Sequence, residues 1–393
     1  MFNILAFLLN VKKYGPEIMR KKLHKLHAYF ALASLIPLII IAVTGSLLVF
    51  KFELDTLLLP EVASISLPVE QQENTTLTRL NINELVTQIN QQFSDYEIGS
   101  WELFDDKYQA DRVYLLKRYS ESWFKIHLNP YSGEVLSTPV PIHHDLTDWL
   151  VQLHFTFLLN DLGFISPQLG TIIGLIASII MTFLGISGLI IYRKFWRRFF
   201  KFRWDAKLAA MMSDLHKLVG IWCSPIILIL GITGGYFNFI EYWHETFEHG
   251  EEAHHIMTDR LYNAELDFQQ LLTTSTEKIT SFTPQYLLFP FEPKMAWTVF
   301  GSIDTNNPFA SAYGSTVSFN AMTGKYLSHY DIRTSNTSTQ VFDSFRTLHY
   351  GNFAGLWSKI IWCVMGLSPL ILGASGFYLW YSRIRRKRVS KQS

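Results

Sequence analysis

Four long apolar stretches constrain this 393-residue chain more strongly than any other feature of its sequence. They cover residues 28–50, 167–192, 218–240 and 355–381. An α-helix needs about 20 apolar residues to cross the hydrocarbon core of a bilayer, and every stretch reaches that length. Because lipid offers no hydrogen-bond partner to an exposed backbone, the stretches predict four transmembrane helices.

Two longer segments, 51–166 and 241–354, separate the predicted spans and differ from them in character. The whole chain is 49% hydrophobic and 17% charged, which is too apolar for an ordinary soluble protein, yet these segments carry mixed charges. Each has a helical stretch followed by short β-rich runs and a tight turn, at residues 129–133 and 320–324. We therefore expect an integral membrane, α-helical fold with two inserted α+β domains.

Clustered lysine and arginine residues next to the spans orient the chain by the positive-inside rule. The rule predicts that the N-terminal segment (1–27), the loop at 193–217 and the tail at 382–393 are cytoplasmic, so both α+β domains are extracytoplasmic. The two cysteines of the chain both lie inside predicted spans, so we expect no disulfide in these domains. The clustered residues are Lys12, Lys13, Arg20, Lys21, Lys22 and Lys25, then Arg193, Lys194, Arg197, Arg198, Lys201 and Arg203, then Arg383, Arg385, Arg386, Lys387 and Arg388.

The second half of the chain repeats the first at an offset of 188 to 195 residues. The spacing of 17 residues between His27 and Thr44 returns between His216 and Thr233. An internal duplication therefore predicts two halves, each with two spans and one inserted domain. The further matches are the turn segments 129–136 and 320–327, the spacings Asp148 to His154 and Asp343 to His349, and the glycine-containing segments 184–188 and 372–376.

Four of the thirteen histidines recur in both halves, near the ends of predicted spans. A single histidine at a membrane end is usually satisfied by a backbone carbonyl or a lipid head group. Recurrence favours a specific role, because ending a helix does not require the same imidazole twice. Haem in a helix bundle needs one imidazole on each face of its iron and small residues beside the macrocycle. The sequence supplies His27, His154, His216 and His349, with Gly45, Gly185, Gly188, Gly234, Gly235, Gly373 and Gly376.

We expect His27 to pair with His216 on the cytoplasmic side, and His154 with His349 on the outer side. Pairing within one half would have to bridge about 30 Å of bilayer. One alternative ligand stays open, because His24 lies three residues before His27 on the same helical face. The depth of His154 is not fixed by the second span, which begins 13 residues later.

Two aspartates, Asp148 and Asp343, each precede a paired histidine by six residues. A carboxylate in such a place caps the helical segment that follows it, or orients the free ring nitrogen of the histidine. Capping is the favoured interpretation.

A second group of histidines and carboxylates follows the third span and has no counterpart in the first half. On a continuous helix its members share one face, and mixed imidazole and carboxylate ligands suit iron or another transition metal. A solvated acidic helix is the alternative interpretation. The candidate iron ligands are His244, Glu248, His249, Glu252 and His255.

The chain resembles the PepSY-associated transmembrane family, in which PepSY domains are inserted between membrane helices. The resemblance covers nearly the whole length and rests on the turn at 129–136, the Leu-His pairs at His27 and His216, and the segment 348–355. Some members of that family are bacterial inner-membrane di-haem reductases that release iron from ferric siderophores in the periplasm. The resemblance thus implies two haem b groups per chain, a ferric siderophore or other ferric chelate as substrate, and a multi-pass position in the inner membrane.

These observations together predict a di-haem b-type electron conduit that reduces an extracytoplasmic ferric chelate and releases ferrous iron for uptake. The sequence has no Walker motif, no GxGxxG after a strand and no HExxH, so a separate cytoplasmic donor or a quinone would supply the electrons. Beyond membrane lipid and the chelate we expect no nucleic-acid partner. The alternatives are a non-enzymatic PepSY protein that binds a peptide or protein, or a permease for a metal or chelate, although the spans lack the internal charges of an ion pathway.

Overall fold

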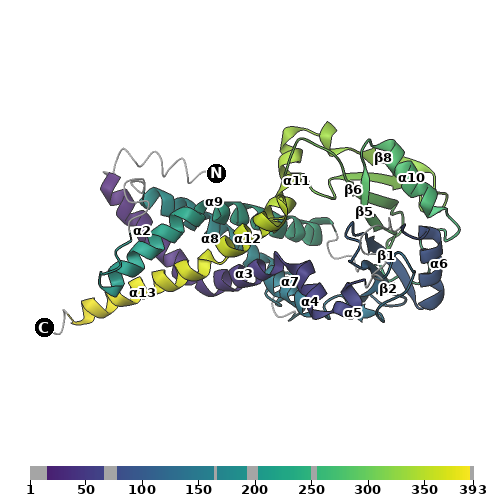
Figure 1. Cartoon of the computed structure of the whole chain (residues 1–393). Coiled ribbons are helices and arrows are strands. Elements are labelled where there is room, and N and C mark those ends of the chain that lie inside the picture. Colours follow the sequence, from purple (N-terminus) through teal and green to yellow (C-terminus); the bar gives the residue numbers. More distant parts are fainter. Residues whose placement is uncertain (1–15, 66–77, 163–165, 193–201, 249–254, 390–393) are drawn as a thin grey trace, which may run out of the picture. The chain divides into compact units, whose positions relative to one another are not determined.

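The computed structural model describes residues 16–65, 78–162, 166–192, 202–248 and 255–389. These residues form two compact units, each built from segments that are distant in the sequence. The helical unit takes in Met1–Val49, Leu150–Glu248 and Leu348–Ser393, and the sheet unit takes in Phe50–Trp149 and His249–Thr347. Figure 1 labels their helices and strands.

The helical unit is a bundle of the apolar segments (Figure 1). Three helical stretches are long and apolar enough to span a membrane, and a bent pair of helices would make a fourth span. The structure therefore has three or four candidate spans, and the sequence predicts four. The helices are α2 (Pro16–Ala33), α3 (Leu35–Leu48), α8 (Leu169–Ile191), α9 (Leu208–Trp243), α12 (Gly355–Gly366) and α13 (Ser368–Val389).

The helix pair in the region of the first predicted span is bent by 66° between α2 and α3, at Ser34. Pro37 has no backbone N–H to give to the carbonyl of Ala33, and its ring crowds that carbonyl, so the helix cannot continue smoothly. The Ser34 hydroxyl donates to the carbonyl of Phe30 at 2.7 Å, a local bond that also favours bending. The sequence placed His27 and His216 just before the first and third predicted spans. Because α2 and α9 begin at Pro16 and Leu208, both histidines instead lie within helices.

Small residues let α8 and α9 pack closely, as is typical of membrane helices. A Cβ atom on Gly231 of α9 would lie 2.6 Å from the Thr182 hydroxyl of α8, and one on Gly174 of α8 would lie 2.7 Å from the Asn238 side chain of α9. Larger residues at these glycines would therefore push the two helices apart. The buried apolar cluster of this unit consists of Leu38, Ala177, Met181, Cys223 and Ile227.

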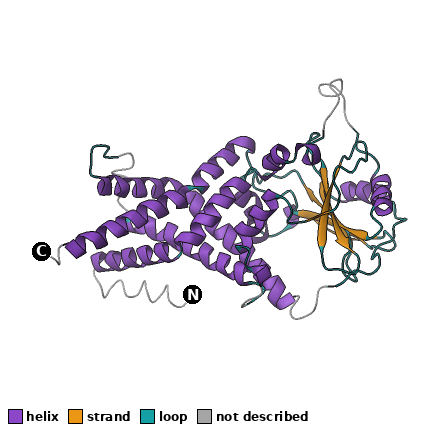
Figure 2. Ribbon diagram, turned by 90° about the horizontal axis from the view of Figure 1, so that it is seen from below, coloured by secondary structure: helices purple, strands orange, loops and turns teal. Residues whose placement is uncertain are grey.

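The sheet unit contains one antiparallel sheet, whose strands are orange in Figure 2. It has eight strands in the order β4-β3-β2-β1-β5-β6-β7-β8. The first half of the chain supplies β1 (Tyr96–Glu102), β2 (Asp111–Lys117), β3 (Trp123–Leu128) and β4 (Val140–Pro141). The second half supplies β5 (Thr283–Leu288), β6 (Trp297–Ser302), β7 (Ser315–Phe319) and β8 (Tyr326–Tyr330).

The two halves join where β1 pairs with β5, with Trp101 opposite Leu287. The two inserted α+β segments that the sequence predicts therefore share one sheet and one compact unit. In separate domains β1 and β5 would each be an edge strand with unpaired backbone groups, and their pairing satisfies both.

Helices α6 (Ile82–Gln92) and α10 (Phe268–Lys278) pack on this sheet and on each other. Side chains of both halves share one core, in which Trp101 and Trp297 are fully buried. The repeated turns are also structural repeats, because the Gly133 amide donates to the Asn129 carbonyl at 2.9 Å and the Gly324 amide to the Asn320 carbonyl at 2.8 Å. Both glycines have positive φ, which a residue with a Cβ rarely adopts.

Short helical segments complete the described chain. They are α4 (Lys51–Leu58), α5 (Pro60–Ala63), α7 (Leu146–Thr156), η3 (Asn160–Leu162), the π-helical turn η5 (His244–Glu248), η6 (Ile332–Thr334) and α11 (Thr337–Tyr350). The C-terminal parts of α7 and α11 belong to the helical unit, and they carry His154 and His349.

Candidate functional site

The helical unit brings the four repeated histidines together in two pairs, each with one member from either half. The rings of His27 on α2 and His216 on α9 have centroids 6.5 Å apart and planes inclined at 80°. The rings of His154 on α7 and His349 on α11 have centroids 6.2 Å apart and planes inclined at 57°. This is the pairing that the spacing of the repeat suggests. We call these the 27/216 pair and the 154/349 pair.

A hydroxyl group on another helix holds the Nδ1 atom of each paired ring. All four contacts have hydrogen-bond length, and each joins a histidine to a serine or threonine of its own half of the chain. The contacts are His27 with Ser187 at 2.8 Å, His216 with Ser375 at 3.0 Å, His154 with Thr44 at 3.0 Å, and His349 with Thr233 at 2.8 Å.

A glycine follows each of these hydroxyl residues and lies against the same ring. A Cβ atom on Gly45 would lie only 2.7 Å from His154 Cε1, and one on Gly234 would lie 3.2 Å from His349 Cε1. The corresponding distances are 3.4 Å for Gly376 to His216 and 3.7 Å for Gly188 to His27. Each ring is thus held by a hydroxyl–glycine seat, which we define as Thr44-Gly45, Ser187-Gly188, Thr233-Gly234 or Ser375-Gly376.

The two pairs fit the axial ligands of haem iron. With metal–nitrogen bonds of about 2.0 Å, two imidazoles on opposite sides of one ion have ring centres about 6 Å apart, close to the separations found here. A bare transition-metal ion usually takes three or more protein ligands. In the part of the chain that the structure describes, no group of three or more histidine, cysteine, aspartate or glutamate side chains can hold such an ion. Two imidazoles suit iron whose other donors come from a macrocycle.

Two other sequence predictions concern histidines outside these pairs. The ring paired with His216 is that of His27, while His24 lies half-buried one turn earlier on α2. In the candidate iron cluster, His244 is exposed in η5 and His255 is half-buried, but His249, Glu252 and the side chain of Glu248 lie outside the described residues. The role of this cluster stays a prediction.

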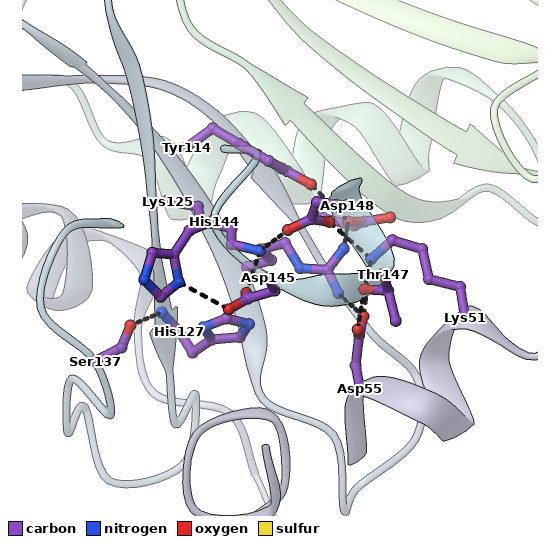
Figure 3. A network of polar contacts seen from close by, with 12 residues as sticks. Lys51, Asp55, Tyr114, Lys125, His127, Ser137, His144, Asp145, Thr147 and Asp148 are labelled. Carbon is purple, nitrogen blue, oxygen red and sulfur yellow. Dashed lines mark hydrogen bonds and ion pairs between the residues drawn. The ribbon is translucent and has the colours of Figure 1, made fainter. Parts of the chain in front are cut away.

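The aspartates that precede His154 and His349 have other partners than the expected ones. Asp148 forms ion pairs with Lys125 and, at 2.9 Å, with Lys51, in the network of the sheet unit that Figure 3 shows. Burial alone would raise the pKa of Asp148, but these two ammonium groups hold that pKa below its ordinary value. Asp343 accepts a hydrogen bond from the Ser311 amide at 2.9 Å. Neither contact caps a helix or orients a histidine.

The hydroxyl residues of the seats were missed as functional residues, although the sequence carried the signal for them, whereas the seat glycines were among the small residues predicted to lie beside the macrocycle. Thr44-Gly45 and Thr233-Gly234 are parts of one repeated motif, and Ser187-Gly188 and Ser375-Gly376 are parts of another. A hydroxyl residue that recurs at a fixed distance from a recurring histidine is a candidate to position its ring.

The fold and the paired imidazoles define a class: multi-pass membrane proteins with a duplicated helical bundle and an antiparallel sheet unit. The comparison with known families agrees, because the model of the PepSY-associated TM region matches residues 24–383. The chain belongs to this family. A curated relative, an uncharacterized protein of Pseudomonas aeruginosa, is 23% identical over 257 residues, which is 60% of this chain. The match spans 63% of that relative, less than two thirds of its length.

Proposed function

We propose that this protein is a membrane di-haem b-type electron conduit that reduces an extracytoplasmic ferric chelate, in the first instance a ferric siderophore. The observation that carries the proposal is the pair of imidazole sites with ring separations of 6.5 and 6.2 Å. His27 and His216 would hold one haem, and His154 and His349 the other. Haem bound there would supply a one-electron ferric/ferrous couple.

The residues around the rings suit such a cofactor. Each seat ties Nδ1 to a hydroxyl group, and its glycine lacks the Cβ atom that would crowd Cε1. The imidazoles are therefore oriented before anything binds. Aromatic side chains lie in the same bundle, with the Phe237 ring centroid 5.4 Å from that of His349, and with Phe30 of α2, one turn after His27, packed on Phe183 of α8. Such side chains exclude water, and a dry, low-dielectric surrounding helps to set a redox potential.

The direction of electron flow is part of the proposal. The basic residues that flank the spans favour cytoplasmic termini in a bacterial inner membrane, with the 27/216 pair near the cytoplasm and the 154/349 pair near the outer side. A cytoplasmic reductant or a membrane quinol would lose one electron for each ferric ion that gains one. Ferrous iron is softer and less charged than ferric iron, so an oxygen-donor chelate holds it less tightly and releases it for uptake.

The first test is the haem content of the purified protein. We expect close to two b-type haems per chain, one of which is lost in His27→Ala and the other in His349→Ala. His143→Ala is a matched control, because His143 is exposed and belongs to the sheet unit. A colourless wild-type protein would overturn the conduit and favour a peptide-binding anchor or a permease.

The second test concerns the substrate. Dithionite-reduced protein, freed of excess reductant, is mixed with a ferric hydroxamate siderophore, and haem oxidation is followed together with capture of ferrous iron by a chromogenic chelator. We expect one ferrous ion for each haem that is oxidised. Haem that stays reduced in the presence of several ferric chelates would overturn the substrate assignment and leave the conduit intact.

A further inference from the structure

The four hydroxyl–glycine seats carry an inference that rests on the proposed function and deepens it. We propose that Thr44, Thr233, Ser187 and Ser375 are positioning residues that keep the proton of each histidine on Nδ1, present Nε2 to the iron and lower the redox potential of each haem. The same set of contacts, a hydroxyl at Nδ1 and a glycine beside Cε1, occurs four times, although the seats lie on four different helices: α3, α8, α9 and α13.

Proton counting at the seats fixes the tautomer. A serine or threonine hydroxyl has one proton to donate and two lone pairs that accept. Thr44 donates its proton to the Ile40 carbonyl at 2.7 Å, so towards His154 Nδ1 it can only accept. Thr233 does the same, with its proton on the Ile229 carbonyl at 2.7 Å. The Nδ1 atoms of His154 and His349 must therefore carry the proton, and the lone pair lies on Nε2.

The 27/216 pair follows the same scheme with serine. Ser375 donates to the Ile371 carbonyl at 2.7 Å and faces His216 Nδ1 at 3.0 Å. Ser187 donates to the Leu184 carbonyl over a longer distance, 3.3 Å, and faces His27 Nδ1 at 2.8 Å. Its proton is the least firmly held of the four, so the tautomer of His27 is the least strongly determined.

The glycine of each seat fixes the ring in space while the hydroxyl fixes its proton. A ring turned by half a rotation about its Cβ–Cγ bond would place Cδ2 at the hydroxyl in the position of Nδ1, so it would lose its hydrogen bond, and it would place Nε2 against Gly45 or Gly234 in the position of Cε1. The two contacts together leave one orientation, and in it the atom that remains for a metal is Nε2.

The electronic consequence follows from what an N–H donor does to the ligand. An imidazole that donates its Nδ1 proton in a hydrogen bond is a stronger electron donor at Nε2. A stronger donor stabilises ferric over ferrous iron, so the hydrogen bond lowers the midpoint potential. Loss of the hydroxyl should therefore raise the midpoint potential of the haem that it serves.

The test compares variants of the 154/349 pair by spectroelectrochemical titration of the purified holoprotein. In the double variant Thr44→Val, Thr233→Val we expect one of the two midpoint potentials to rise and the other to stay. Loss of such an outer-shell partner typically changes metal affinity about 10-fold or more. A 10-fold change in the ratio of ferrous to ferric binding corresponds to about 59 mV for a one-electron couple.

Two controls separate the hydrogen bond from packing. Thr44→Ser, Thr233→Ser keeps both hydroxyls, and we expect it to restore the wild-type potential. Thr182→Val removes a hydroxyl of α8 that donates to the Ser178 carbonyl and is not the hydroxyl partner of any paired histidine, and we expect both potentials to stay.

Unchanged midpoint potentials in a double valine variant with two haems would overturn the inference, as would a Thr182→Val shift of the same size. If the valine variant loses one haem, retention by the serine variant supports the hydroxyl, and loss in both overturns it. A wild-type protein without haem would instead overturn the proposed function.

Discussion

If the protein binds the two proposed haems, replacement of Gly45 by alanine should cost it one of them, because the new methyl group needs the space of the His154 ring. A Cβ at Gly45 lies 2.7 Å from His154 Cε1, whereas ordinary contacts begin at 3.4 Å. The difference between these distances means that the His154 ring would have to move away by about 0.7 Å. Metal–ligand distances vary by only about 0.2 Å, so this shift is several times larger. The ring could therefore not keep both its hydroxyl contact and its place on the iron.

The four seats provide a graded series for this experiment. The clearance between the Cβ position and the Cε1 atom of the ring rises from Gly45 through Gly234 (3.2 Å) and Gly376 (3.4 Å) to Gly188 (3.7 Å). All four glycines lie in helices, where alanine gains about 1 kcal/mol in helix propensity. Overpacking of a filled site costs about 1–3 kcal/mol, so only the tight seats should lose more than they gain. Gly188→Ala is the matched control that should keep both haems.

The assay is the haem-to-protein ratio of the purified variants, together with their ferric absorption spectra. We expect Gly45→Ala to show one low-spin haem, with the second lost or converted to a high-spin form that has a single axial histidine. Equal behaviour of Gly45→Ala and Gly188→Ala, whether both keep two low-spin haems or both lose one, would show that the ring clearance does not control binding.

Three further predictions concern the ring planes, the ion pairs and the shared sheet. The ferric protein should give two distinct low-spin electron paramagnetic resonance signals, because the ligand planes are inclined at 80° in one pair and 57° in the other; a single signal would contradict the geometry. Lys125→Met removes the buried ammonium group that Asp145 and Asp148 share and leaves Asp148 with Lys51 alone, so we expect thermal unfolding of the sheet unit to show a loss of up to about 3–5 kcal/mol. Because the pKa of Asp148 is lowered in the folded protein, its ion pairs stabilise the protein above the ordinary carboxyl pKa, and this stabilisation is lost as the pH falls through the lowered pKa. Over that pH range the stability of the methionine variant should depend less on pH, and an unchanged pH dependence would exclude the pairing. Trp101→Ala should cost about 3–5 kcal/mol and lower the hydrogen-exchange protection of β6 as well as β1, because both halves share one core; protection lost in the first half alone would contradict a single unit.

The repeated sequence was enough to predict which histidines pair. Two halves with the same His-to-Thr spacing place corresponding residues at corresponding depths, so His27 meets His216 and His154 meets His349. The apolar stretches also predicted the spans, but not the helix ends, since a helix continues past the bilayer wherever its polar residues permit. The bend between α2 and α3 could have been read from Pro37, which follows the break by three residues.

The pairing of β1 with β5 could not be predicted from the same signals. Strand pairing between the halves depends on which edge each inserted segment exposes, and alternating residues mark a strand without naming its neighbour. The capping role predicted for Asp148 was wrong for a related reason. Its spacing from His154 fits a helix cap, but Lys51 and Lys125 are brought to it by the fold from distant positions in the chain.

The duplication explains why each seat lies within one half while each histidine pair crosses between the halves. Ser187 holds His27 and Thr44 holds His154, so the first half orients both of its own histidines; Ser375 and Thr233 do the same for the second half. One half thus contains two complete seats but only one axial ligand for each proposed haem. Because each pair joins corresponding histidines of the two halves, as equivalent residues meet in an isologous dimer, neither proposed haem site can be complete without both halves.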